Sequence, residues 1–195
     1  MQDYSKLDQM ASNWHQLAHY REKFNESEYF EKALAQSELL LEEITKITHQ
    51  EPFRLEFMAS CFANNFWRFN RHNRSPETPE LPGRFGCRVR VKDNKFEASW
   101  YINVFLDEED MKRRKNKHQR VRSVHIPKGP SSRYRPSSFS KAQDWEKVKI
   151  NYAEDAFQLL REIRHEMDNI RKKVEMCQRR FIKLRDHFEL MEEPK

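Results

Sequence analysis

The sequence predicts an α+β fold, in which a long antiparallel helical coiled-coil stalk carries a small three-stranded antiparallel sheet in a basic head. Both ends of the chain repeat apolar residues every three or four positions, while the middle alternates apolar with polar residues and gathers the positive charge. The chain of 195 residues is 35% charged and 37% hydrophobic. This balance suits long solvent-facing helices better than a large globular core.

The C-terminal helix is predicted by twelve apolar positions that follow one another in steps of three and four residues. No Pro or Gly interrupts them, and at 1.5 Å per residue the helix would be roughly 58 Å long. A rod of that length needs a partner helix, either from the same chain or from a second copy. The twelve positions are Ala153, Ala156, Leu160, Ile163, Met167, Ile170, Val174, Cys177, Phe181, Leu184, Phe188 and Met191.

The N-terminal arm, residues 1–51, is the expected partner. Residues 4–24 read as one helix, and the pattern breaks at 25–27, where Ser27 can cap a second helix that Pro52 ends. The arm holds 5 Lys/Arg against 10 Asp/Glu, so it can pair with cations beside the C-terminal seam. We therefore expect antiparallel packing within one chain, and the cations are Arg161, Arg164, Arg171, Lys172, Lys173, Arg179, Arg180, Lys183 and Arg185.

Two further segments lead into and out of the predicted sheet. A helix over residues 53–71 is predicted by its aromatic face, and residues 73–83, with three Pro and one Gly, read as a loop. The C-terminal helical pattern starts near Phe139, where Ser137 or Ser138 can serve as the cap.

A period of two predicts the sheet itself. Residues 87–105 form a hairpin with one buried face, and Asp93-Asn94 has the composition of its turn. Apolar residues from Phe96 to Val104 face the core in the second strand, and residues 120–126 read as a third strand. In the first strand, Cys87, Val89 and Val91 alternate with the cations Arg88, Arg90 and Lys92.

The charge follows three predicted domains, with net −5 in residues 1–51, +11 in 52–143 and 0 in 144–195. Between Met111 and Gln143 the chain has eleven Lys/Arg and no acidic residue. Such asymmetry is typical of a nucleic-acid contact. The alternative is a solvated basic loop that balances the acidic N-terminal arm.

A basic loop and strand of this density would neutralise several phosphates, so binding should weaken steeply with salt. A two- or three-stranded ribbon can enter a major groove, where we expect Arg88 or Arg90 to reach bases while the other cations hold the backbone. The predicted DNA-binding residues are Arg88, Arg90, Lys112, Arg113, Arg114, Lys115, Lys117, Arg120, Arg122, Lys128, Arg133 and Arg135.

Catalytic and metal-binding patterns are weak. The acidic run 107–110 reads better as a solvated turn than as a cation site, and His15 and His19, four residues apart, lack a third zinc ligand. Tyr101 and Tyr134 are candidate nucleophiles, but no metal-binding histidine cluster accompanies them. We therefore expect no enzyme activity, no cofactor and no bound metal.

The expected location is the cytoplasm. The three cysteines are widely spaced and odd in number, which indicates reduced thiols rather than a disulfide framework. The N-terminus lacks the apolar run of a signal peptide, and no stretch of about 18 apolar residues predicts a membrane span.

The central motifs occur in a familiar order. Arg88-Val89-Arg90 precedes Trp100-Tyr101, a basic strand ends in His125-Ile126-Pro127-Lys128-Gly129, and Tyr134, Phe139 and Trp145-Glu146 lead into the long helix. Over residues 85–185 this order resembles the MobI family of conjugative transfer proteins, found on SXT-type integrative conjugative elements and A/C-type plasmids.

The resemblance implies an accessory factor that acts at an origin of transfer, where a relaxase nicks one strand. It supplies no catalytic residues. Trp100 is in phase with the apolar face and is expected in the core, whereas Lys128 and Arg133 are expected to meet phosphate.

We therefore expect sequence-specific binding of double-stranded origin DNA and recruitment of the relaxase. The stalk would join a homodimer or dock another transfer protein. Two rival functions stay open: a coiled-coil interaction adaptor without direct DNA binding, and a nuclease that uses Asp/Glu with Mg²⁺.

Overall fold

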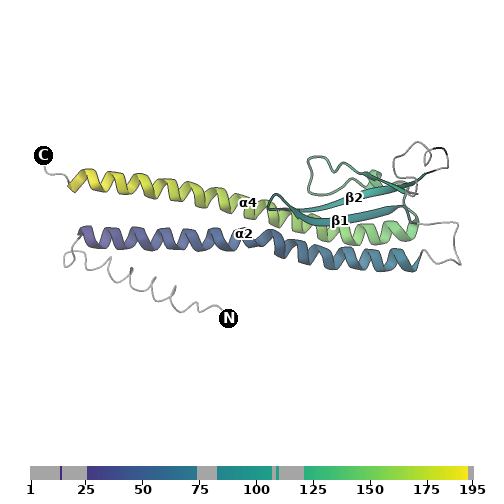
Figure 1. Cartoon of the computed structure of the whole chain (residues 1–195), viewed down its shortest axis with the longest axis horizontal. Coiled ribbons are helices and arrows are strands. Elements are labelled where there is room, and N and C mark those ends of the chain that lie inside the picture. The colour runs from purple at the N-terminus through teal and green to yellow at the C-terminus, as the bar shows by residue number, and fades with distance from the viewer. Residues whose placement is uncertain (1–13, 15–25, 74–82, 107–108, 110–120, 193–195) are drawn as a thin grey trace. The chain divides into compact units, whose positions relative to one another are not determined.

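The structure, a computed structural model, describes residues 14, 26–73, 83–106, 109 and 121–192. The described elements are α2 (Glu26–His72), β1 (Phe85–Lys92), β2 (Lys95–Phe105), β3 (Val121–His125), the 3₁₀ helix η2 (Pro136–Phe139) and α4 (Asp144–Glu192), as Figure 1 shows. The predicted α+β class is confirmed. The chain divides into two compact units, the first made of residues 1–45 and 174–195 and the second of residues 46–173.

The three strands form one antiparallel sheet in the order β1-β2-β3. The predicted hairpin is confirmed, because β1 pairs with β2 and the chain reverses at Asp93 and Asn94, whose φ angles are 50° and 56°. Positive φ at both central residues is what a two-residue hairpin turn requires, and Asn and Asp tolerate it best after Gly. The third strand also forms, over Val121–His125.

The alternation of side chains in the sheet follows the predicted period of two. Phe96, Ala98 and Trp100 are buried on one face, while Arg88 and Arg90 are exposed on the other. The burial weakens toward the end of β2, where Val104 is exposed. The core therefore lies under the hairpin half of the sheet.

In the second unit the sheet covers parts of α2 and α4 (Figure 1). Aromatic rings belong to the core between these two layers. The Trp100 ring meets Phe66 of α2 edge-on at 5.1 Å between ring centroids, and it meets Phe157 of α4 at 5.8 Å. Trp100 is fully buried, which confirms its predicted place in the core. Such edge-to-face contacts add to the stabilisation that burial of large rings provides.

The helix α2 runs unbroken through Pro52, so the prediction that Pro52 ends the N-terminal arm is wrong. A proline inside a helix costs roughly 3 kcal/mol, because it removes one backbone hydrogen bond and crowds the preceding turn. Pro52 is fully buried and Leu55 packs into the core one turn later. The packing of this turn thus overrides the local penalty. The predicted helix over 53–71 is the second half of α2.

Both predicted serine caps are also wrong. The helix α2 already begins at Glu26, so Ser27 lies inside it. Ser137 and Ser138 lie in η2, and α4 begins later, at Asp144. At that start the buried carboxylate of Glu146 accepts the backbone N–H of Gln143 at 3.2 Å and that of Phe85 at 3.1 Å. A carboxylate in the first turn of α4 thus caps the helix in place of the predicted serine. The same carboxylate binds the first residue of β1.

In the first unit, α2 and α4 run antiparallel. The Phe30 and Phe188 rings stack with centroids 3.8 Å apart, and Arg185 forms a bidentate pair with Glu38 at 2.9 Å. The Arg185 pair agrees with the predicted pairing of the C-terminal cations with the acidic arm. The heptad interlocking of a coiled coil stays a prediction, and the predicted helix over 4–24 lies outside the described residues apart from Trp14.

Among the described residues, Arg161 and Arg164 pair with carboxylates of α4 and not with the acidic arm, which corrects the sequence prediction. Both guanidinium groups reach the sheet, where Arg161 Nη2 donates to the Ala98 carbonyl at 3.0 Å and Arg164 Nη1 donates to the Phe96 carbonyl at 3.2 Å. Their carboxylate partners, Glu154 and Asp168, lie on α4 itself. The heptad pattern could not reveal this, because it fixes the face of the helix and not the element that covers it.

Glu154 is a buried carboxylate that binds three different residues in the second unit. Its carboxylate accepts Trp100 Nε1 at 2.7 Å and the Tyr134 backbone N–H at 2.9 Å. It also forms a bidentate pair with Arg161, at 2.8 and 3.2 Å. Arg161 in turn donates to the Ser132 carbonyl at 2.6 Å. One ion pair therefore joins α4 to β2 and to the segment that follows β3.

We predict that Glu154→Ala destabilises the protein by about 3–5 kcal/mol, because it leaves the Arg161 guanidinium buried without its carboxylate. Urea unfolding followed by circular dichroism measures the change. The control is Glu166→Ala at an exposed position of the same helix, which should change stability by about 0.5 kcal/mol or less. Equal effects of the two substitutions would contradict the central role of Glu154.

Cys87 gives a second prediction. Burial raises the pKa of its thiol to about 12, and only the thiolate is nucleophilic. At pH 8 iodoacetamide should therefore modify the exposed Cys61 and leave Cys87 intact until denaturant is added. Peptide mass spectrometry of the native and unfolded protein measures this. Equal alkylation of both cysteines in the native protein would place Cys87 outside the core.

Candidate nucleic-acid interface

The candidate site lies at the edge of β2 that β3 leaves uncovered. Because β3 pairs with residues 101–105 of β2, residues 95–100 have a second edge on which the described part of the chain places no strand. Arg161 and Arg164 supply donors to two carbonyls of that edge, and the backbone N–H of Ile126 donates to the Trp100 carbonyl at 3.0 Å. Side chains of α4 thus replace a neighbouring strand, which is one way proteins protect a sheet edge.

A pocket of about 490 Å³ opens at this edge. Three different elements build it, namely the hairpin, the segment after β3, and α4. Its lining residues are Arg88, Arg90, Phe96, Glu97, Ala98, Ser99, His125, Lys128, Tyr134, Arg161 and Arg164. A second pocket of about the same volume adjoins it and shares Lys128, Arg161 and Arg164.

Positive charge dominates the first pocket. Five Lys or Arg side chains line it against the single carboxylate of Glu97. Glu97 is bound across the hairpin by Arg90, with 2.8 Å between Nη2 and Oε2. Charges of one sign that line a concave surface raise the local concentration of oppositely charged ligands. We call the five cations Arg88, Arg90, Lys128, Arg161 and Arg164 the edge cluster.

Lys128 sits where the two pockets meet. Its ammonium group donates to the carbonyls of Gly129, at 3.4 Å, and Ser131. Partial burial lowers the pKa of Lys128, the nearby charges of Arg161 and Arg164 lower it further, and Glu154 opposes the shift. The protein thus holds this ammonium where its charged form is disfavoured.

Two further donors in the edge cluster are buried and unmatched within the described part of the chain. The Nε atoms of Arg161 and Arg164 make no hydrogen bond there. Arg164 Nε does lie 3.4 Å from Asp168 Oδ2, an ion-pair distance without hydrogen-bond geometry. Buried donors normally find a partner, so these two Nε atoms are exceptions to the usual pairing.

An aromatic platform adjoins the cations on the outer face of the sheet. The Tyr101 ring lies against Gly86, where an added Cβ would come within 2.4 Å of Tyr101 Cζ. The Arg88 guanidinium lies 6.0 Å from the same ring centroid, and the Trp67 ring lies at 6.4 Å. Only glycine allows this close approach of the ring to the backbone.

The sequence-predicted cations divide into three groups. Arg88, Arg90 and Lys128 meet in the edge cluster. Arg122 pairs with Val104 on the opposite face of the sheet, Arg133 is bound to Asp155 and, at 3.1 Å, to Gln158, and Arg135 is exposed before η2. The other six lie outside the described residues, and they are Lys112, Arg113, Arg114, Lys115, Lys117 and Arg120.

Sequence reasoning missed Arg161 and Arg164 as members of the site, because it assigned them to the helical stalk. One signal was present. Glu154 and Arg161 are seven residues apart and therefore share a helix face, and each directly follows a seam residue, Ala153 or Leu160. A carboxylate and a guanidinium at that spacing beside an apolar seam indicate a buried pair.

The candidate nucleophile Tyr134 is part of the core. Its hydroxyl accepts the Trp100 backbone N–H at 3.4 Å, and burial raises the pKa of the phenol above its ordinary value. A raised pKa makes the phenolate scarcer at neutral pH, which is unfavourable for nucleophilic attack.

Within the described ranges no three His, Cys, Asp or Glu side chains lie together as metal ligands would. The described helices also lack a stretch that is long and apolar enough to span a membrane.

Comparison with known proteins adds one match. Residues 55–175, more than half of the chain, match a family model described as MobI protein. This region contains the whole described sheet and all five residues of the edge cluster. No curated protein and no solved structure matches the chain.

We predict that Lys128→Met leaves stability unchanged or raises it by about 0.5 kcal/mol or less, because it removes a charge that the fold disfavours. The lowered pKa means that the disfavoured charge is present below pH 10.5, the ordinary lysine value, and disappears above it. Any gain in the free energy of unfolding should therefore shrink as the pH rises toward 10.5.

Urea unfolding at neutral pH and near pH 10.5 measures this difference. The matched control is Lys147→Met, which removes an exposed pair with Asp144 (2.9 Å). It should lower the free energy of unfolding by roughly 0.3 kcal/mol. A loss above about 1 kcal/mol in Lys128→Met would mean that Lys128 serves the fold instead.

Proposed function

Since this chain belongs to the MobI family, we propose that it is a DNA-binding accessory protein for conjugative transfer. Membership of the family supports a role in conjugative mobilisation. In our proposal the protein binds the double-stranded origin of transfer and helps to recruit the relaxase. It supplies recognition and assembly, and the relaxase performs the strand cleavage.

The observation that carries the proposal is the edge cluster. Cations from the hairpin, from the segment after β3 and from α4 converge on one pocket that a single carboxylate shares. Lys128 is held there although burial and its neighbours lower its pKa. Three of the five cations are paired with carboxylates of the protein, namely Arg90 with Glu97, Arg161 with Glu154 and Arg164 with Asp168. Arg88 and Lys128 are therefore the cations proposed to meet an external anion first, and the phosphates of DNA are closely spaced anions of this kind.

The outer face of the hairpin supports a proposal in which different cations contact bases and phosphates. Arg90 is held by Glu97 across the strands, whereas Arg88 lies beside the Tyr101 ring. A two-stranded ribbon fits the major groove, and Arg donates to O6 and N7 of guanine. We therefore assign Arg88 to base contact, and Lys128 with Arg164 to the phosphate backbone.

The basic tract of residues 111–120 would enlarge this contact. It connects the end of β2 to the start of β3, so both its ends are attached to the sheet that carries the edge cluster. Its Lys and Arg residues are proposed to contact further phosphates. Each such contact releases counterions and adds to the salt dependence of binding.

An adaptor without direct DNA binding is the second candidate function. It is favoured by exposed apolar side chains on the helices of the first unit, among them Leu39 and Leu190. Exposed apolar surface of this kind commonly contacts another protein. Electrophoretic mobility shifts with origin and random duplexes separate the two functions, because an adaptor should shift neither.

We predict that the double variant Arg88→Gln/Lys128→Met binds duplex DNA more weakly by roughly tenfold or more. The slope of log K against log salt should fall in magnitude by roughly 0.9, because Lys128 is the residue of the two that is assigned to phosphate. Loss of Arg88, assigned to a base, should reduce the preference for origin over random duplexes. Fluorescence anisotropy with an origin fragment at several salt concentrations measures both values.

The control for this test is Lys172→Gln/Lys173→Gln, which removes the same charge from exposed positions of α4 away from the pocket. It should leave the slope nearly unchanged. Equal losses in both double variants would show a general charge effect and would remove the edge cluster from the DNA contact.

A separate variant tests the tract. Replacing Arg113, Arg114 and Lys115 with Ala should weaken binding and lower the salt slope by roughly 3, if all three contact phosphate. The measurement is the same anisotropy titration at two or more salt concentrations. Unchanged affinity and slope would exclude the tract from the interface and leave the edge cluster as the proposed contact.

A further inference from the structure

Planar side chains from all three strands lie in one row on the outer face of the sheet. Tyr101 of β2 is paired with His125 of β3, and Arg88 of β1 is paired with Ser99, two residues before Tyr101. Paired side chains on one face have Cβ atoms roughly 5 Å apart and diagonal neighbours lie roughly 7–8 Å apart, within reach of long side chains. We call the three planar groups of Arg88, Tyr101 and His125 the planar platform.

The planar platform lies on the exposed face of the sheet. Arg88 and His125 are exposed, and Tyr101 is half-buried with its ring against Gly86. Both helices pack on the opposite face, under Trp100, so the described helices and strands leave the platform uncovered (Figure 1). The Arg88 guanidinium lies 6.0 Å from the Tyr101 ring centroid, which shows that a planar cation can lie beside this ring.

The pocket of about 490 Å³ at the edge of β2 adjoins the platform, since Arg88 and His125 also line that pocket. Arg88 and Lys128 are the two pocket cations for which the described residues provide no salt bridge. A pocket of this size is in the range that holds small ligands, so it admits a single nucleotide. A double helix, which is wider than its own major groove of about 12 Å, stays outside it.

Unpaired bases are the ligands that match this combination of groups. Aromatic rings and guanidinium planes stack on the faces of bases, and every base has such a face. In a duplex these faces are already stacked on the neighbouring base pairs, so only an unpaired strand offers them. The cations beside the platform would hold the phosphates of that strand.

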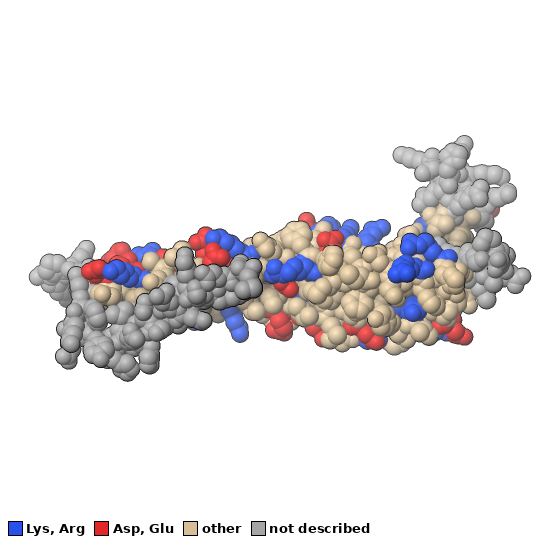
Figure 2. Space-filling model, turned by 90° about the horizontal axis from the view of Figure 1, so that it is seen from below, with Lys and Arg blue, Asp and Glu red and all other residues tan. Residues whose placement is uncertain are grey.

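The charge of the outer sheet face also favours an anionic strand. The outer faces of β1 and β2 carry four cations and one carboxylate, namely Arg88, Arg90, Lys92, Lys95 and Glu97. The carboxylate is already bound by Arg90. Figure 2 shows the molecule from below the view of Figure 1, where small groups of basic and acidic side chains both lie among tan surface. The excess of positive charge at the sheet is therefore complementary to phosphates.

We infer that the planar platform binds single-stranded DNA, with bases stacked on Tyr101 and His125 and a phosphate held by Lys128. This inference deepens the proposed function and rests on it for the choice of DNA. The chain would then hold an unpaired strand as well as a duplex. Arg88, which belongs to both the platform and the edge cluster, would connect the two contacts.

Fluorescence anisotropy at pH 8 tests this inference with a labelled strand of about 15 thymidines and with a duplex of the same length. The wild-type chain should bind both. Tyr101→Leu/His125→Leu should weaken binding of the single strand roughly tenfold or more, because it removes two stacking surfaces. The same variant should change the affinity for the duplex by about twofold or less. Its salt slope with the single strand should stay unchanged, since the loss is one of stacking and not of phosphate contacts.

Two control variants separate stacking from other effects. Tyr101→Phe keeps the ring and should bind the single strand as the wild-type chain does. Phe57→Leu removes a ring that is 73% exposed on α2 and should leave binding unchanged. Circular dichroism checks that each variant is folded. If the double variant does not fold, His125→Leu alone, at an exposed position, should still weaken binding of the single strand selectively.

The outcomes distinguish this inference from the proposed function. Binding of the duplex without binding of the single strand would overturn the inference and leave the proposed function in place. Failure to bind either would overturn both. Equal losses for single strand and duplex in the double variant would assign the platform to the duplex contact instead. Tighter binding of a uridine strand of the same length would overturn the assignment to DNA.

Discussion

The buried pair of Glu154 and Arg161 is the interaction on which the second unit depends. The carboxylate holds the Trp100 indole and the Tyr134 backbone, while the guanidinium holds the Ser132 and Ala98 carbonyls. Each charge is therefore satisfied by other elements as well as by its partner. A buried pair contributes little net stability compared with an apolar replacement, but it tolerates only one arrangement of its neighbours. It thus fixes how the helix, the sheet and the segment after β3 fit together.

The Arg161 guanidinium also lines the candidate DNA site. Arg161 neutralises Glu154 on one side and lines the pocket with Lys128 and Arg164 on the other, so the structural pair also places a guanidinium at the sheet edge. The lowered pKa of Lys128 is a consequence of that neighbour together with partial burial. In the proposed function, Arg161 therefore has two roles, because it stabilises the core and lines the pocket proposed to bind DNA.

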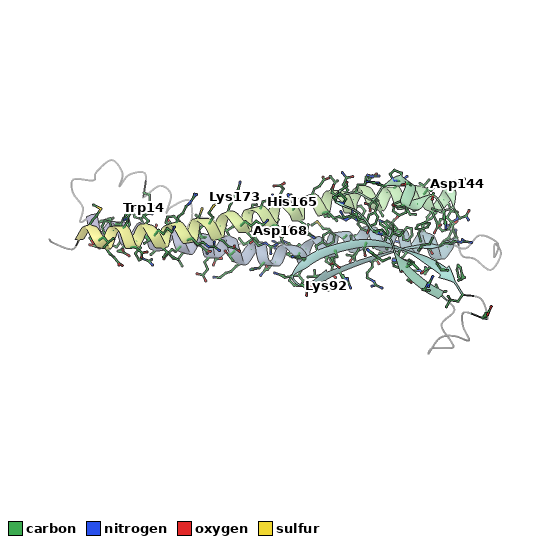
Figure 3. The ribbon with its side chains drawn as sticks, turned by 90° about the horizontal axis from the view of Figure 1, so that it is seen from above. Trp14, Lys92, Asp144, His165, Asp168 and Lys173 are labelled. Atoms are coloured by element: carbon green, nitrogen blue, oxygen red, sulfur yellow. The ribbon has the colours of Figure 1, made fainter. Side chains whose placement is uncertain are left out.

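Helix α4 of the second unit has two faces with different surroundings. On α4, Phe157 packs under Trp100 and Arg161 reaches the sheet edge, while Leu159 and Tyr152 point to the opposite, apolar face. Figure 3 labels Lys92, at the turn end of the hairpin, and Asp144, at the start of α4.

The sequence by itself determined the elements whose cause is local. The period of two, with Asp93-Asn94 between its halves, determined the hairpin and the burial of Trp100, and the heptad steps determined α4. It also identified three of the five edge-cluster cations, because they lie on the hairpin and at a basic motif.

The tertiary structure decided what depends on distant partners. In the structure α2 continues through Pro52, and Glu146 caps α4 where a serine was predicted. Arg161 and Arg164 donate hydrogen bonds to the sheet. The reason is physical: backbone propensity and side-chain period act over a few residues and are written in the sequence around them. The neighbour that desolvates a side chain and accepts its hydrogen bonds can be far away in the sequence, as Ala98 is from Arg161, 63 positions apart.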